Sequence, residues 1–182
     1  MNSKLIIWMQ TIDLENNPGG AEKFIANLSR QFIINKYKPI IIAAKNNLSI
    51  PFIENYNLDN IKLKILRLPR PKIWLFGSLI YVLLSILAIN IYYYRVKIVH
   101  FNTINHRAAL ISFFSVIFKK RVYFRSNGGD SWFLESKILK KHKFSKLHIF
   151  LLNLSRKIIV QSKEGEDLMR KIGLNSSLIE RI

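Results

Sequence analysis

The chain has 182 residues, of which 29 are Lys or Arg and 11 are Asp or Glu, giving a formal net charge of +18 at pH 7. Disordered chains combine high charge with low hydrophobicity, so the 49% of hydrophobic residues excludes disorder and predicts one folded domain with a sizeable core. Because cysteine is absent, disulfides, thiolate metal sites and cysteine nucleophiles are excluded, and the four scattered histidines argue against any metal site. The charge favours an anionic partner, which composition leaves open between nucleic acid, an acidic membrane surface and a phosphorylated substrate.

Strands and helices alternate from the first residues onward. Lys4 to Met9 is rich in strand-forming residues, and Asn16-Asn17-Pro18-Gly19-Gly20 then predicts a turn. From Ala21 to Phe32 apolar residues recur every three or four positions, which predicts a helix with one core-facing stripe. The apolar stretch at the start is too short for a signal peptide, so we expect a cytoplasmic protein.

The same alternation continues along the rest of the chain. Strands are predicted at Pro39–Ala44, Ile61–Leu68, Lys97–Phe101, Arg121–Phe124 and Lys157–Gln161, and helices at Asn105–Phe118, Lys143–Leu154 and Lys163–Ile172, the last ended by Gly173. Alternating strands and helices with short connections predict an α/β fold, in which a mainly parallel sheet carries helices on both faces.

Two glycine loops follow strands at the edge where parallel sheets bind ligands. Pro18-Gly19-Gly20 precedes a helix, so its bare backbone suits the approach of an anion, and the alternative is an ordinary glycine turn. In the second loop, Asn127 and Asp130 suit either hydrogen bonds to sugar hydroxyls or the capping of a helix. Neither loop has the spacing of a dinucleotide fingerprint or of a P-loop.

Four segments, taken in order, resemble one enzyme family. They are Asn17 to Lys23 before an amphipathic helix, Lys97-Ile-Val-His100-Phe-Asn102, Val122 to Asp130 with its Asn127-Gly128-Gly129-Asp130, and Lys157 to Ser162 followed by Leu168 to Gly173. Together they resemble the N-terminal domain of family 4 glycosyltransferases over nearly the whole chain. Such enzymes have the GT-B architecture of two Rossmann-like domains facing across a cleft. The resemblance implies that residues 1–182 form the Rossmann-like, acceptor-side domain.

The resemblance also implies which residues bind substrate. The positions that the family implies for substrate binding are Gly19, Gly20, His100, Asn127, Gly128, Gly129, Asp130 and Ser162. Asn127 departs from the pattern, because the family usually has a histidine there. An amide orients a hydroxyl or phosphate but does not exchange protons as an imidazole does, so no catalytic residue is assigned. For His100 the alternative interpretation is a buried core histidine.

The family holds its nucleotide-sugar donor mainly in a C-terminal domain, and these residues stop where members usually continue into it. We therefore expect the chain to lack the donor-binding half and to be inactive alone, and leave open whether a separate subunit supplies it. The resemblance implies a metal-independent transferase without a cofactor, in which a nucleotide-sugar is the co-substrate. The implied acceptor is lipid-linked or a polysaccharide, at the inner face of the membrane.

Residues 73–94 are an uncharged, apolar segment between Lys72 and Arg95. Its length suits a membrane span, but both flanks are basic and strands of one sheet lie before and after it. We expect, in order of preference, a helix touching the membrane surface, a buried core helix and a span. The nearby basic residues either bind anionic headgroups or form a solvated surface: Arg67, Arg70, Lys72, Lys137, Lys140, Lys141, Lys143 and Lys146.

Two other classes of function compete with the transferase. A nucleic-acid-binding module requires aromatic residues interleaved with Lys and Arg on a sheet face or a recognition helix, whereas here the aromatics cluster in apolar runs. We therefore expect no nucleic-acid partner. A small membrane-anchored or basic binding protein without catalysis is the remaining alternative, with residues 73–94 as its anchor.

Overall fold

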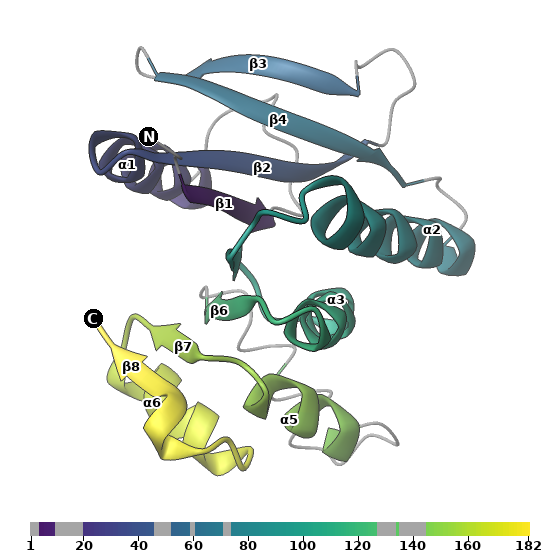
Figure 1. Cartoon of the computed structure of the whole chain (residues 1–182). Helices are drawn as coiled ribbons and strands as arrows, with labels where there is room; N and C mark the ends of the chain where they lie inside the picture. The colour runs from purple at the N-terminus through teal and green to yellow at the C-terminus, as the bar shows by residue number, and fades with distance from the viewer. Residues whose placement is uncertain are drawn as a thin grey trace. The chain divides into compact units, whose positions relative to one another are not determined.

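The computed structural model describes residues 4–9, 20–45, 52–58, 61–70, 74–126, 134 and 145–182 (Figure 1). The chain divides into two compact units, Met1–Ile98 and Val99–Ile182. Strands alternate with helices in both units, so the predicted α/β class is confirmed.

The first unit is built on a sheet with the strand order β3-β4-β2-β1. Its strands are β1 (Lys4–Met9), β2 (Tyr37–Lys45), β3 (Ile53–Leu58) and β4 (Ile61–Pro69). β1, β2 and β4 are parallel, whereas β3 pairs with β4 in antiparallel register. The predictions of β1, β2 and β4 are confirmed. β3 was not predicted, because its sequence Ile-Glu-Asn-Tyr-Asn-Leu contains asparagines that strands usually avoid.

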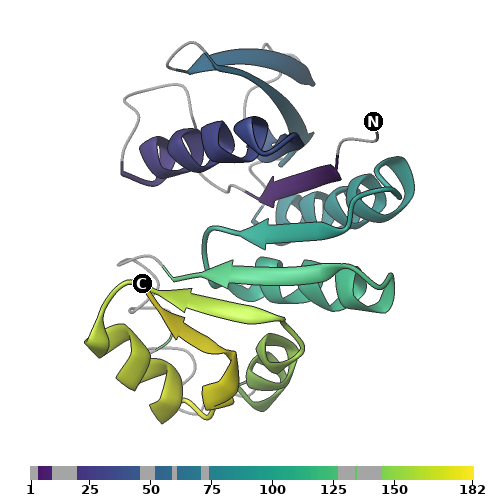
Figure 2. The ribbon, with the colours of Figure 1, turned by 60° about the vertical axis from the view of Figure 1, so that its left-hand side comes forward.

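Helices cover both faces of this sheet. α1 (Gly20–Ile34) buries the predicted stripe, since Ile25 packs in a core cluster with Ile41, Ala43, Leu63 and Ile65. Side chains alternate along a strand, so Ile40 and Ile42 point to the opposite face, where they are also buried. α2 (Trp74–Leu87) packs on β4, and Figures 1 and 2 show α1 and α2 on opposite sides of the sheet.

The apolar segment 73–94 is helical over most of its length. α2 continues into a π-helical turn, η1 (Ala88–Tyr92), in which the Tyr93 N–H donates to the Ala88 carbonyl at 2.9 Å. One side of this helix is buried and the opposite side is exposed, so the interpretation as a wholly buried core helix is wrong. Within the described ranges, no helix is both long and apolar enough to cross a membrane.

The second unit has the strand order β5-β6-β7-β8. Its strands are β5 (Ile98–Phe101), β6 (Arg121–Arg125), β7 (Lys157–Val160) and β8 (Ile179–Arg181), and the β6–β7 and β7–β8 pairs are parallel. The helices of this unit are α3 (His106–Ile117), α5 (Ser145–Asn153) and α6 (Lys163–Lys171), each of which follows one strand and precedes the next (Figures 1 and 2). All of these were predicted except β8, which is too short to show a pattern and follows a 3-10 turn, η3 (Ser176–Leu178).

Side chains and backbone conformation explain the limits of the helices in the second unit. The Asn105 side chain accepts a hydrogen bond from the Ala108 N–H at 3.0 Å and begins α3. The Ser162 hydroxyl accepts one from the Gly165 N–H at 3.1 Å and begins α6. Gly173, with a φ of 93°, follows α6 in the left-handed conformation that glycine tolerates best, as its predicted role as a helix stop requires.

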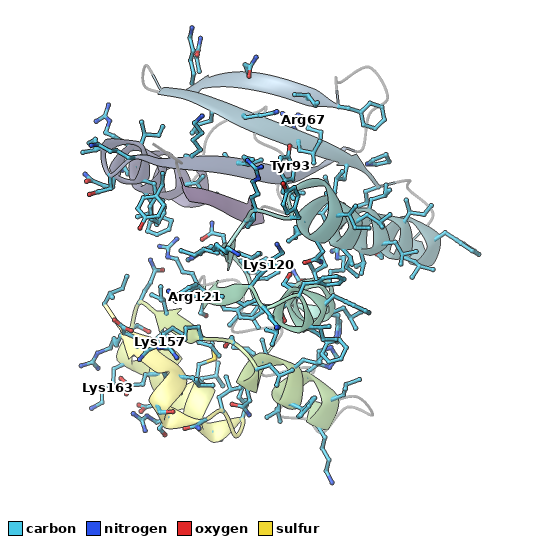
Figure 3. All side chains as sticks on the ribbon, viewed as in Figure 1. Arg67, Tyr93, Lys120, Arg121, Lys157 and Lys163 are labelled. Carbon is cyan, nitrogen blue, oxygen red and sulfur yellow. The ribbon has the colours of Figure 1, made fainter. Side chains whose placement is uncertain are left out.

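Arg67 lies inside the first unit, which corrects the expectation that it belongs to a basic surface (Figure 3). Its side chain is 0% exposed, and its Nε donates to Glu54 Oε2 at 2.8 Å. Strand alternation gives Arg67 the same face as Leu63 and Ile65, which are buried. The guanidinium is therefore held in the interior by a carboxylate from the neighbouring strand.

Candidate functional site

Three buried polar side chains lie at the carboxyl ends of β5 and β6. His100 is the third of four residues in β5, Asn102 follows that strand directly, and Arg125 is the last residue of β6. His100 and Arg125 are each 6% exposed and Asn102 is 1% exposed. Burial of polar groups costs free energy unless they are paired, and ligands of such sheets bind at this edge. We refer to the three residues as the strand-end cluster.

Strand alternation explains why the three side chains meet. The rings of Phe101 and Phe124 stack with their centroids 4.9 Å apart, so these two side chains lie on the same face of the sheet. Their sequence neighbours His100, Asn102 and Arg125 therefore lie on the other face. There Arg125 Nη1 donates a hydrogen bond to Asn102 Oδ1 at 3.3 Å.

The strand-end cluster combines a neutral imidazole with a cation. Burial, and secondarily the positive charge of Arg125, lower the pKa of His100 from 6.5 to about 3, so this imidazole is neutral at neutral pH. Burial also lowers the pKa of Arg125, but a guanidinium stays protonated in proteins. Its fork of N–H donors is suited to phosphate and carboxylate groups. Chemically, the cluster can hold an anion and orient hydroxyl groups.

The predicted glycine loops fall mostly outside the described residues. Ser126 extends the β6–β7 pairing, since its N–H donates to the Ile159 carbonyl at 2.9 Å. The segment Asn127, Gly128, Gly129 and Asp130 follows it directly but lies outside the described ranges, as does Gly19. Gly20 is the first residue of α1, as the predicted helix start requires, and its ligand contact stays a prediction.

Ser162 lies beyond the carboxyl end of β7, where its hydroxyl caps α6. The first turn of this helix contains Glu164 and Glu166. Hydrogen bonds from the Glu164 backbone and from Ser162 lower the pKa of Glu164, so the carboxylate is negatively charged beside the helix N-terminus. The structure thus gives Ser162 a role in folding, and its predicted contact with substrate is untested.

Asn102 and Arg125 were not predicted as site residues. Asn102 directly follows β5, and Arg125 is the last residue of β6. Each is separated by one residue from another polar side chain on the same face, His100 and Tyr123 respectively. That two-residue spacing of polar groups at strand ends is the signal that identifies them.

Two of the four histidines, which are scattered along the sequence, contact each other in the structure. His106 Nδ1 contacts His148 Nε2, which joins the start of α3 to α5. In the part of the chain that the structure describes, there is no group of three or more His, Cys, Asp and Glu side chains able to hold a metal ion. The pair is one of the contacts between α3 and α5.

No protein-family model and no curated protein matches the chain, but solved structures do. The chain is similar over 98% of its length to sucrose-phosphate synthase from Thermosynechococcus elongatus, at 11% identity and a TM-score of 0.67, covering 47% of that protein. It is also similar over 98% of its length to Anabaena HepE in complex with UDP and glucose, at 13% identity and a TM-score of 0.60, covering 44% of HepE. UDP-GlcNAc 2-epimerase from Methanocaldococcus jannaschii is similar to 98% of the chain at 14% identity and a TM-score of 0.61, and the chain covers 45% of that protein.

These similarities establish the fold. The chain has the Rossmann-like α/β fold of one half of a GT-B architecture, and it spans about half the length of the solved structures that it matches. At identities of 11–14%, the activity of those proteins is not carried over by similarity alone.

Proposed function

We propose that this chain is the acceptor-side domain of a glycosyltransferase, which transfers a sugar from a nucleotide-sugar to a lipid-linked or polysaccharide acceptor at the inner face of the membrane. The observation that carries the proposal is the strand-end cluster, which puts a buried cation at the edge where this fold binds ligands. The fold supports it, because similar solved proteins include HepE, whose structure contains UDP and glucose.

Each residue of the cluster has a role in this proposal. Arg125 binds an anionic group of the sugar substrate, and its burial strengthens that attraction because water screens it less. Asn102 holds the guanidinium through its Oδ1. His100, neutral at working pH, exchanges hydrogen bonds with substrate hydroxyls and carries no proton-transfer step. Rate enhancement then comes from positioning the substrates and stabilising the departing diphosphate, without a metal or cofactor.

Transfer in this proposal requires a second, donor-binding domain. Holding two reactants in the correct geometry contributes about 7–11 kcal/mol in well-oriented reactions, and one domain alone does not orient both. A polypeptide limited to these 182 residues should therefore transfer no label from radiolabelled nucleotide-sugars to lipid or polysaccharide extracts. Time-dependent transfer by this polypeptide, above a Gly20→Val control, would show that one domain suffices.

The role of Arg125 is tested against a matched arginine of the same strand. Arg121 begins β6 and is exposed, whereas Arg125 ends β6 and is buried (Figure 3 labels Arg121). Calorimetric titration with glucose 1-phosphate and UDP-glucose should show about ten-fold or more weaker binding for Arg125→Gln and an unchanged affinity for Arg121→Gln. Arg125→Lys, which keeps the charge without the fork, should be intermediate.

The alternative of a basic binding protein without catalysis predicts a different result. If net charge alone attracts anions, Arg121→Gln and Arg125→Gln weaken binding equally, since each removes one positive charge. Chemical unfolding of both variants shows whether a loss of binding reflects loss of the fold.

A further inference from the structure

One side of the α2–η1 helix exposes an uninterrupted series of apolar side chains. Apart from the adjacent pair Leu79 and Ile80, they follow one another at three or four residues and therefore lie on one side of the helix: Phe76, Leu79, Ile80, Leu83, Leu87, Ile91 and Tyr94. Tyr81, Ser85 and Ala88 on the opposite side are buried against the first unit. We call the exposed series the outer α2 face, and Figure 3 shows side chains along α2 that project away from the strands.

An apolar face of this extent indicates a partner. From Phe76 to Tyr94 it is about 27 Å long, and all but one of its side chains are about half exposed or more. A surface helix of a protein surrounded by water normally carries charged and polar residues on its outer side. Contiguous exposed apolar residues instead mark a surface that another molecule or a membrane covers.

The charges around the outer α2 face select the partner. Between Asn60 and Gly129 the sequence has twelve Lys and Arg and no Asp or Glu. Arg95 and Lys97 follow the helix directly and are exposed. Two copies of this chain meeting through the face would bring like charges together, which disfavours self-association. An anionic bilayer complements both the apolar side chains and the positive charge.

The end of the helix has the arrangement expected at a membrane interface. Arg95 Nε donates to the Tyr94 hydroxyl at 2.8 Å, and the Arg95 guanidinium carbon lies 5.4 Å from the centroid of the Tyr94 ring. An amphipathic aromatic ring beside a cation suits the depth of the lipid headgroups.

We propose that the outer α2 face is the surface through which the first unit lies on an anionic membrane. The leucines enter the boundary between headgroups and acyl chains, the helix axis is parallel to the bilayer, and Arg95 and Lys97 contact lipid phosphates. The proposed function places the protein at the inner face of a membrane, and this inference names the surface that makes the contact. It rests on the proposed function only for which membrane is bound.

Vesicle sedimentation tests the inference with two matched variants. Leu83→Ser/Leu87→Ser changes the outer α2 face, and Leu110→Ser/Ile117→Ser changes exposed apolar residues of α3. With vesicles of phosphatidylcholine and phosphatidylglycerol, the first variant should bind about ten-fold or more weakly than the unchanged chain, and the second should bind normally. Because all four residues are exposed, thermal unfolding should be unchanged in both.

Electrostatics provides a second, independent variant. Arg95→Gln/Lys97→Gln should weaken binding to the anionic vesicles and leave the weaker binding to pure phosphatidylcholine unchanged, and high salt should abolish the difference. Equal vesicle binding by Leu83→Ser/Leu87→Ser and Leu110→Ser/Ile117→Ser would overturn the proposal. So would lipid-free light scattering that shows dimers abolished by Leu83→Ser/Leu87→Ser, since a second copy would then cover the face. No sugar is present, so these results are independent of the transfer assay.

Discussion

The two units of the molecule share one plan of strands and helices but put their polar groups to different uses. In the first unit, Arg67 and Glu54 form a buried ion pair between neighbouring strands, and the helix that leads out of the sheet exposes an apolar face. In the second unit, buried polar side chains gather at the carboxyl ends of β5 and β6. The difference shows that one plan of strands and helices can carry different surfaces. The individual residues decide whether a unit exposes apolar side chains or gathers buried polar side chains at its strand ends.

At neutral pH, the largest effect on stability is expected at the buried ion pair. Glu54→Ala removes the carboxylate that Arg67 contacts in the interior. Because the Glu54 side chain is 27% exposed, the free energy of unfolding should fall by about 3 kcal/mol, the low end of the range for a broken buried pair. The matched change in the second unit is Glu166→Ala, which breaks the exposed pair with Arg170 and should have a much smaller effect. Urea unfolding measures both.

A double variant controls for the buried charge. Arg67→Met/Glu54→Leu replaces the pair by apolar side chains and should recover much of the loss, because the uncompensated charge is gone. Equal losses for Glu54→Ala and Glu166→Ala would contradict the distinction between the two units.

His100 should make the stability of the second unit depend on pH. Its pKa is 6.5 when unfolded and about 3 when folded, so between these values the unfolded chain binds a proton that the folded chain does not. The stability linked to His100 is therefore fully present above pH 6.5 and falls by about 1.4 kcal/mol per pH unit below it. His100→Gln should remove this pH-dependent part of the stability. Urea unfolding of the variant and of the unchanged chain, measured between pH 3 and pH 7, gives the difference. An unchanged pH dependence would contradict burial of a neutral imidazole.

A smaller effect separates the two roles of Ser162. Ser162→Ala should cost about 1 kcal/mol of stability, like Asn105→Ala at the start of α3, because each removes a helix cap. Ser162→Asn, which retains a capping oxygen, should restore the unfolding midpoint. If Ser162→Asn is stable but binds UDP-glucose more weakly, the predicted contact of Ser162 with substrate is supported.

The smallest effect on stability is expected at Gly20 in the first unit. Gly20→Val should cost roughly 1 kcal/mol or less, since it changes only the first residue of α1, but should weaken ligand binding by blocking close approach of the backbone. Thermal unfolding and calorimetric titration of the same preparation compare the two effects. A loss of several kcal/mol would make Gly20 a structural glycine.

Local patterns predicted most of the fold, and the misses have physical causes. The apolar run of β2 and the stripe of α1 report burial directly, so both elements were predicted. β3 was missed because its pairing with β4 overrides a sequence of low strand propensity. The burial of Arg67 depends on Glu54, a partner on that unpredicted strand, and Arg125 gains its surroundings from β5. Such cross-strand partners are invisible to spacing along the chain.

The central claim is that an anionic sugar binds at the strand-end cluster, and locating the binding site on the chain tests it most directly. Amide shifts in a ¹⁵N-labelled chain would be followed during titration with glucose 1-phosphate and UDP-glucose, with glucose as the neutral control. We predict the largest shifts at His100, Asn102 and Ser126, their loss in Arg125→Gln and their retention in Arg121→Gln. Shifts confined to other parts of the chain, or equal shifts in both variants, would contradict a ligand site at the carboxyl ends of β5 and β6.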